Sequence, residues 1–474
     1  MTQLRHALLI ASAALAACSA EPGANLAPAA GIHIDSIGYY QGPKHELMRD
    51  GEAVDSDVSI VEARDGILRL FLSTDDDYDG EPVTVRYTLD GVEELIEVDH
   101  VDESAREHRL ASTVNLDVPW ESATDGVPWS VEVLQERGEG DDGTARWPAD
   151  GTDELAFDGR DNALRVVVAP FSYENDGSGR LPDLSDEAME RLRLRLKSLY
   201  PVSDVELTVR DPEPWNGFLG PGGDGWQAIG FRIFQMREED GATDDVYYYG
   251  MFNPTETVQQ FCAGGCLLGV TLLNDSPPDT GSVQLRLAIG VGFDEVVDDT
   301  TAHELGHAHG RPHAPCGPPG NLPDGIDPEY PHAGAELGTW AWDVAQERLV
   351  DPGENTDIMG YCEDQFVSDY TWERLYDRTQ NVNAGLSIEG DLTWDLFSWD
   401  GQQVAWQQTL RSAPMAGRMV EVTASRDGQP VPVGARYVGW DHLPGGVLLV
   451  PRLGGAPERV AFTLDGEVVV ADVP

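Results

Sequence analysis

A chain of 474 residues, 41% of them hydrophobic, is long enough for two or three domains with packed cores, which excludes wholesale disorder. It carries 84 acidic and 31 basic residues, for a formal net charge of −53. Such a charge repels nucleic acids and anionic membrane surfaces, so we expect neither as a partner. No pattern in the sequence indicates an oligomeric state.

The N-terminus has the pattern of an export signal. A short basic start precedes an apolar run that ends at residue 17 and is too short to span a bilayer. The run ends in L-A-A-C, which resembles the lipobox of bacterial lipoproteins. That resemblance implies a signal peptide at residues 1–17, lipidation of Cys18, and a flexible tether at 18–31. The protein would be exported and held at the outer membrane or cell surface of a bacterium by its lipid alone. The alternative is an ordinary signal peptide with a stray cysteine, and hence a secreted protein.

Residues 32–158 show short alternating strands separated by turns, of which 58–61, 67–72, 83–87 and 129–133 are the clearest. This pattern is typical of an all-β sandwich of immunoglobulin-like type. Nothing in it indicates catalysis.

One loop of this segment is rich in aspartate. Asp75, Asp77, Asp79 and Gly80 match the D-x-D-x-D-G opening of a Ca²⁺ loop. Arg86, however, stands where the closing glutamate of an EF-hand would be. A solvated acidic hairpin is therefore favoured over a calcium site.

Strands and helices alternate from residue 159 to 386. Strands are predicted at residues 164–170, 204–209, 246–250, 267–273 and 284–291, and helices at 185–200, 226–237 and 371–383. Another helix is predicted to begin near residue 296, because acidic residues in a first turn favour the positive end of the helix dipole.

This last helix carries the motif H-E-x-x-H-x-x-G-x-x-H. His303 and His307 are four residues apart, so both imidazoles lie on one helix face and can share a metal ion. Glu304 is placed to contact a water molecule on that metal. Gly310 lets the helix stop abruptly, so that His313 can return as a third ligand. Three protein ligands leave a position for water, which is typical of catalytic Zn²⁺.

A second motif follows at residues 357–362, D-I-M-G-Y-C. Together with the zinc motif it resembles the metzincin metallopeptidases, over residues 164 to 385. The resemblance implies that Met359 forms a hydrophobic floor under the zinc. It also implies that Tyr361 ligates the zinc and stabilises the transition state, as in the astacin-like and serralysin-like members. Ala314, which follows the third histidine, matches none of the family patterns, so the family within the clan stays unassigned.

The resemblance implies a fold and a function. The expected fold class is an α+β metzincin-like catalytic domain at residues 159–386, with a mixed twisted sheet and an active-site helix. All-β sandwich-like modules flank it at 32–158 and 387–474. The expected function is that of an exported zinc-dependent endopeptidase, with a zinc-activated water and Glu304 as general base. Its partners are protein or peptide substrates, glycoproteins included, and residues 267–273 form the edge strand that binds them.

Cysteine usage agrees with export. Apart from Cys18 the chain has four cysteines, an even number suited to an oxidising compartment. The most natural pairing joins Cys262 to Cys266 and Cys316 to Cys362. The second bond would tie the segment after the third histidine to the methionine turn.

Two other functions stay open. The chain is alternatively a surface lipoprotein whose β modules bind protein or carbohydrate and whose zinc site is vestigial. It is also compatible with a zinc hydrolase that acts on a non-peptide bond.

Overall fold

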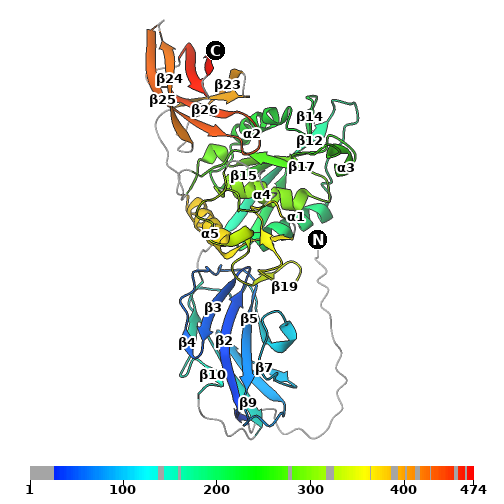
Figure 1. Ribbon diagram of the computed structural model, residues 1–474, viewed down its shortest axis with the longest axis vertical. Coiled ribbons are helices and arrows are strands. Elements are labelled where there is room, and N and C mark those ends of the chain that lie inside the picture. The colour runs from blue at the N-terminus through cyan, green and yellow to red at the C-terminus, as the bar shows by residue number, and fades with distance from the viewer. Residues whose placement is uncertain are drawn as a thin grey trace.

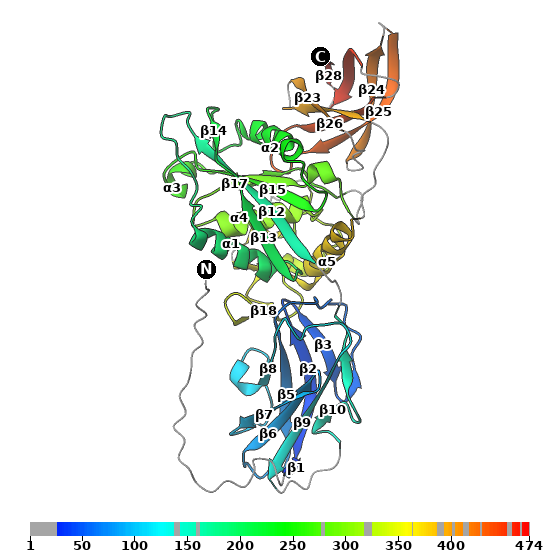
Figure 2. The ribbon, with the colours of Figure 1, turned by 180° about the vertical axis from the view of Figure 1, so that it is seen from behind.

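The computed structural model describes residues 26–136, 143–157, 162–275, 280–316, 325–362, 364–385, 393–400, 403–410, 417–426, 429–452, 457–464 and 467–473. Three parts follow one another along the long axis of the molecule (Figure 1). A pair of N-terminal sheets lies at one end, a sheet covered by helices lies in the middle, and a C-terminal sheet lies at the other end; Figure 2 shows the same order from behind.

Two antiparallel sheets make the N-terminal part. The first has the strand order β4 (Glu52–Ala53), β3 (Lys44–Arg49), β2 (Ile32–Tyr40), β5 (Gly66–Thr74), β8 (Val114–Val118). The second has the order β1 (Leu26–Pro28), β9 (Val127–Glu136), β6 (Val83–Leu89), β7 (Val92–Val98), with β10 (Arg146–Trp147) and β11 (Asp153–Leu155) also paired to β9. Alternate residues of β6 and β8 are buried, as a strand with one face on a core requires. Both sheets contribute to one core around Trp129.

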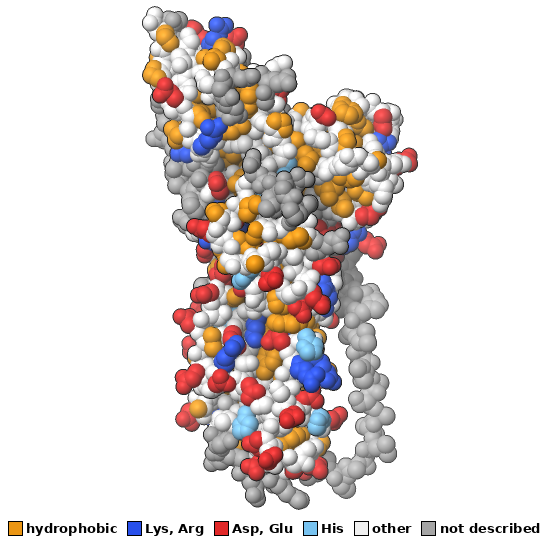
Figure 3. Space-filling view, viewed as in Figure 1, with side chains coloured by type: hydrophobic (Ala, Val, Ile, Leu, Met, Phe, Trp, Pro, Cys, Tyr) orange, Lys and Arg blue, Asp and Glu red, His pale blue; other side chains and the backbone are white. Residues whose placement is uncertain are grey.

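The surface of this part carries much of the negative charge. On the face seen in Figure 3, acidic side chains are scattered across the N-terminal sheets, and lysine and arginine occur in small groups between them. This distribution is that of a solvating surface rather than of a focused binding patch.

The middle part is built on a mixed sheet. Its order is β13 (Asp204–Val209), β12 (Ala163–Tyr173), β15 (Val246–Phe252), β17 (Leu287–Val291), β16 (Gly269–Thr271), with β14 (Glu213–Trp215) also paired to β12. The pairs along this path are parallel except the last, in which β16 runs antiparallel to β17. The strand β16 is therefore the edge strand of this sheet.

Helices cover both faces of this sheet. They are α1 (Asp186–Leu199), α2 (Trp226–Asp240), α3 (Val258–Phe261), α4 (Val297–Ala308) and α5 (Asp369–Asn383). Short 3₁₀ turns lie at Val283–Leu285 and Ala333–Ala335, and another, Leu110–Ser112, belongs to the N-terminal part. Residues of α1, α4 and α5 share one core with the sheet, and residues of α2 share another on the opposite face. Ser185 caps α1 by accepting a hydrogen bond from the backbone N–H of Ala188, and Leu192, Leu196 and Leu199 form its buried stripe.

Two short strand pairs follow the end of α4. They are β18 (Ala341–Asp343) with β19 (Arg348–Val350), antiparallel, and β20 (Thr356–Asp357) with β21 (Gln365–Phe366), parallel. The second pair holds the methionine turn between its two strands.

The C-terminal sheet is antiparallel throughout. Its order is β23 (Val404–Leu410), β22 (Trp394–Trp399), β26 (Gly446–Pro451), β25 (Gln429–Gly439), β24 (Arg418–Arg426), β27 (Arg459–Leu464), β28 (Glu467–Asp472). It packs against α2, because Trp440, Leu443 and Leu449 belong to the same core as that helix. The C-terminal sheet is thus docked on the middle part through apolar contacts.

The expected fold class is wrong. An α+β metzincin-like domain flanked by β modules was predicted, whereas the chain is mostly β, with 41% strand, 17% helix and several separate sheets. The prediction relied on two short motifs. A short motif determines the local backbone geometry, but it does not determine how sheets and helices are arranged around it. Residues 58–61, predicted as a strand, are mostly irregular, and the segment after His313 adds strand pairs that its proline and glycine content did not indicate.

Candidate metal centre

Helix α4 presents the first part of the candidate site. It carries His303, Glu304 and His307, all of them buried. Asp298 and Asp299 lie in its first turn, where their negative charge complements the partial positive charge of the helix N-terminus. The four-residue spacing puts the two histidines on the same face, so their imidazoles project in one direction.

A glycine turns the chain after α4 towards the third histidine. Gly310 has φ +83°, in the left-handed region that favours glycine. A Cβ atom at this position would lie 2.6 Å from Nη2 of Arg378 and 2.8 Å from the backbone oxygen of Asn274. The backbone N–H of His313 then donates to the carbonyl of Gly325, which anchors the returning segment.

We expect Gly310→Ala to destabilise the protein far more than Gly241→Ala, the matched control. Gly241 also has positive φ and follows a helix, but its Cβ would meet nothing within 4 Å. The control should cost about 1 kcal/mol of unfolding free energy, from left-handed strain alone. Gly310→Ala adds overlap with backbone and should cost roughly 3 kcal/mol or more. Urea unfolding of both variants measures the difference, and equal losses would contradict this role of Gly310.

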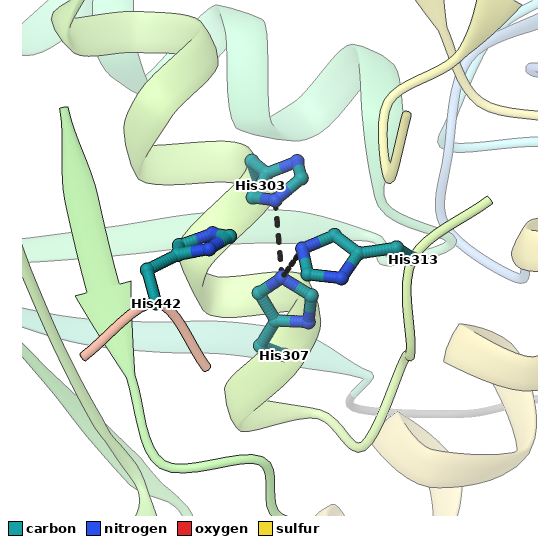
Figure 4. A group of neighbouring side chains, drawn as sticks. All are labelled: His303, His307, His313 and His442. Carbon is teal, nitrogen blue, oxygen red and sulfur yellow. Dashed lines mark hydrogen bonds between the residues drawn. The ribbon is translucent and has the colours of Figure 1, made fainter. Parts of the chain in front are cut away.

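The three motif histidines converge on one point (Figure 4). Nε2 of His307 lies 3.0 Å from Nε2 of His303 and 3.0 Å from Nε2 of His313. Ligand nitrogens of one tetrahedral zinc, each about 2.0–2.1 Å from the metal, lie roughly 3.3 Å apart, so these spacings suit a shared ion. The histidine group could therefore hold a metal ion.

Contacts at the other ring nitrogens orient two of these histidines. Nδ1 of His303 lies 2.7 Å from the carbonyl oxygen of Ile358, and Nδ1 of His307 lies 2.5 Å from that of Arg311. A carbonyl only accepts, so each Nδ1 carries the proton and each Nε2 presents its lone pair to the metal position. Burial lowers the pKa of His303 to about 4 and that of His313 to about 2, which keeps the rings neutral as ligands must be.

Met359 packs against α4. A Cβ at Gly306 would lie 2.4 Å from the sulfur of Met359, so the missing side chain at Gly306 makes room for the methionine. Asp357 holds the turn: its Oδ1 accepts from the backbone N–H of Met359 at 2.8 Å, and its backbone oxygen accepts from that of Gly360 at 2.8 Å. Met359 in turn accepts a backbone hydrogen bond from Ala314, which links the turn to the third histidine.

Tyr361 lies at the same point and is partly exposed. Its hydroxyl oxygen is 2.6 Å from Nε2 of His313 and 2.7 Å from Nε2 of His442. Its backbone N–H donates to the carbonyl of Cys316. The hydroxyl is therefore placed beside the ligand nitrogens, within reach of anything bound there.

Two cysteine pairs lie at disulfide distance. Cys316 and Cys362 have Cα atoms 5.8 Å apart, and Cys262 and Cys266 have Cα atoms 4.8 Å apart. The first pair joins the segment that follows His313 to the methionine turn. The segment after His313 and the methionine turn are therefore joined by the Cys316–Cys362 disulfide as well as by backbone hydrogen bonds.

The C-terminal sheet supplies two more residues, which the sequence did not indicate. Asp441 and His442 lie in the β25–β26 loop (residues 440–445), and His442 belongs to the same potential metal group as the three motif histidines. A second potential group consists of Glu304, Asp441 and His442. Both residues lie more than a hundred positions beyond His313, between two strands, so no spacing rule connects them with the motif.

Glu304 is buried beside this loop. A Cβ at Gly269 would lie 2.4 Å from Cγ of Glu304, so the edge strand approaches the glutamate as closely as glycine permits. Burial, and then the negative charge of Asp441, raise the pKa of Glu304. Burial also raises the pKa of Asp441. Two buried carboxyl groups in contact favour sharing a proton over both being charged.

Two pockets lie on either side of His442. One, of about 630 Å³, is lined by Leu267, Leu268, Gly269, Thr300, His303, Glu304, Tyr361 and His442, among others. The other, of about 710 Å³, is lined by His307, His313, Gly325, Tyr437, Trp440, Asp441 and His442, among others. The β25–β26 loop therefore separates two hollows that both reach the histidine group.

Two other predicted sites are the lipidation site and the acidic loop. The lipidation site, Cys18, lies outside the described residues. In the acidic loop, Oδ1 of Asp75 accepts from the backbone of Asp77, and Oδ1 of Asp79 accepts from the Gln135 side chain. Among the residues that the structure describes, these aspartates form no group that could hold a metal ion.

No helix in the described ranges has the length and apolar character to cross a membrane.

Comparisons with known proteins assign no family. No protein-family model matches the sequence, and no curated protein matches it. A solved structure of Parabacteroides merdae β-glucuronidase aligns with 13% identity and a TM-score of 0.14, over 49% of this chain and 31% of that one. The same enzyme with glycerol in its active site gives 14% identity and a TM-score of 0.13, over 42% and 28%. The chain thus spans about a third of that enzyme, and scores this low say nothing about fold or function.

Proposed function

We propose that this protein is a zinc-dependent endopeptidase. The observation that carries the proposal is the approach of three histidine Nε2 atoms to one point. Glu304 lies on the same helix as His303 and His307, and it lines the same pocket as His303. Nitrogen ligands in this number and arrangement suit Zn²⁺ and leave a position for a reactant. The sequence motif, which resembles that of the metzincin metallopeptidases, gives the reaction class.

Each residue has a defined role in this proposal. His303, His307 and His313 hold the metal, and the carbonyls of Ile358 and Arg311 keep two of the rings in the ligating tautomer. Zinc, when bound, supplies a Lewis acid that polarises the scissile carbonyl and lowers the pKa of water. The Glu304 carboxylate takes the proton of the attacking water and later delivers it to the leaving amine.

In this proposal Tyr361 stabilises the carbonyl oxygen of the substrate, which becomes negatively charged during the reaction. Its hydroxyl lies 2.6 Å from Nε2 of His313, so it can donate a hydrogen bond to the carbonyl oxygen as that oxygen becomes an oxyanion. Met359 has no chemical step. It packs under α4 and keeps the helix and the third histidine in register.

We also propose that the enzyme is exported and anchored through a lipid on Cys18. Four cysteines paired at disulfide distance support an oxidising compartment. The substrates are then proteins or peptides outside the cytoplasm. The surplus of acidic residues favours basic substrate segments over acidic ones.

A chelator experiment tests the function. The full chain, loaded with zinc, is incubated with casein and separately with a small carboxylic ester. We expect casein cleavage that stops with 1,10-phenanthroline and returns when zinc is added. Casein cleavage that is unaffected by the chelator, or hydrolysis of the ester alone, would contradict the proposal.

A further inference from the structure

The β25–β26 loop occupies the edge of the middle sheet. Residues Leu272 and Trp440 form an antiparallel bridge, and the backbone N–H of Asp441 donates to the carbonyl of Thr271 at 3.0 Å. The Asp441 carboxylate accepts from the backbone N–H of Thr271 at 2.9 Å. The loop thus pairs with the outer side of β16 as an added antiparallel strand would.

Its side chains reach into the histidine group. The His442 ring lies with its centroid 5.1 Å from that of His313 and 6.3 Å from that of His307, and Figure 4 shows it facing the three motif histidines. One of its ring nitrogens lies within 4.8 Å of a ligand nitrogen of each of the other three. A neutral imidazole at this place is chemically equivalent to the motif ligands.

The Asp441 side chain also reaches the histidine group. Its Oδ2 lies 3.2 Å from Nε2 of His442 and 3.7 Å from Nε2 of His307, and its side chain is 4% exposed. This oxygen has no hydrogen-bond partner among the described residues. A buried carboxylate oxygen this close to converging imidazole nitrogens is itself suited to a cation.

Apolar contacts hold the loop in this position. A Cβ at Gly230 of α2 would lie 2.6 Å from the Trp440 ring, and a Cβ at Gly223 would lie 2.0 Å from Leu443. The side chain of Gln227 donates to the carbonyl of Pro444 at 2.8 Å. The loop is therefore seated against complementary surfaces and is not a segment that merely hangs over the site.

We propose that His442 is a fourth protein ligand of the metal, and that the β25–β26 loop closes the site of the proposed peptidase. The coordination of the metal by His442 does not depend on the proposed function. Only its effect on peptide hydrolysis rests on that function. With His442 bound, four protein nitrogens fill a tetrahedral zinc, and no position is left for a reactant. Asp441 covers Glu304 at the same time, and the loop takes the β16 edge that an extended peptide would use.

The proposal implies two states of one chain. In the closed state the loop is bound as described, and in the open state it has left β16 and the metal. Substrate binds the open state alone, so its apparent affinity is the intrinsic affinity reduced by the open fraction. The C-terminal sheet then controls the activity of the middle part.

The test compares the zinc-loaded full chain with His442→Ala and with His442→Gln, which keeps more of the packing. His108→Ala, at an exposed histidine in a turn of the N-terminal part, is the matched control. X-ray absorption at the zinc edge counts the imidazole ligands. We expect four in the wild type and in the control, and three in both His442 variants.

Acetohydroxamate, a small chelating probe that needs free metal positions, measures closure independently of any peptide. We expect its affinity to rise at least about 10-fold in the His442 variants, and the rate of casein cleavage to rise with it. The same imidazole count, or the same acetohydroxamate affinity, in wild type and both variants would overturn the inference. Changed coordination and affinity without casein cleavage by any variant would uphold the inference and refute the peptidase function. A chain that binds no zinc would overturn both.

Discussion

Replacing Glu304 by Gln should lower the rate of peptide hydrolysis by about 10²–10⁴-fold, the range that a positioned general base contributes. The amide keeps the size of the side chain but no longer takes a proton from water. Glu304 is not among the residues proposed to hold the metal, so zinc content should stay the same. Steady-state cleavage of a fluorogenic peptide, together with metal analysis, measures both quantities.

Glu238→Gln is the matched control for this variant. Glu238 is exposed near the end of α2 and away from the histidine group, so the same chemical change there should leave the cleavage rate as it is. A Glu304→Gln protein that cleaves as fast as the control would remove Glu304 from the mechanism. Loss of zinc along with activity would assign it a ligand role instead.

Replacing His307 by Ala should remove the metal. His307 is the central member of the group, with Nε2 3.0 Å from those of His303 and His313, so its loss removes the ligand that lies between the other two. We expect zinc affinity to fall by at least about 100-fold, more than the loss of an outer-shell partner costs. Competition with a fluorescent zinc chelator measures it.

His309→Ala is the contrast on the same helix end. The His309 ring stacks on Tyr247 with centroids 4.0 Å apart, and its Nδ1 lies 2.6 Å from the carbonyl of Leu305, away from the metal group. This variant should lower the free energy of unfolding through lost packing, with zinc affinity nearly unchanged. Equal zinc affinities in the His307 and His309 variants would contradict the assignment of ligands.

The local part of the site was predictable because helix and turn geometry is periodic. Residues four apart on a helix share a face, and Gly310 marks the stop that returns the chain, so the placement of His303, His307 and His313 could be expected from spacing alone. These expectations needed only residues close together in the chain. The contact of Met359 with Gly306 was not predicted, because the resemblance implied only a hydrophobic floor under the zinc.

The long-range part was not predictable. Asp441 and His442 reach the site because the C-terminal sheet docks on α2 and its loop pairs with β16, and both contacts depend on tertiary packing. A single aspartate–histidine pair between two strands has no pattern that marks it. The predicted fold class was wrong for the same reason, because two short motifs contain no information about the number of sheets around them.

The most direct test of the central claim is to identify new N-termini by mass spectrometry. A bacterial protein extract is incubated with the zinc-loaded His442→Ala chain, in which the loop ligand is absent, and with the same chain also carrying Glu304→Gln. We predict new N-termini inside protein sequences, made by peptide-bond hydrolysis, with the first protein and their loss with the second. The same new N-termini in both samples, or none in either, would contradict a zinc peptidase that uses Glu304 as its base.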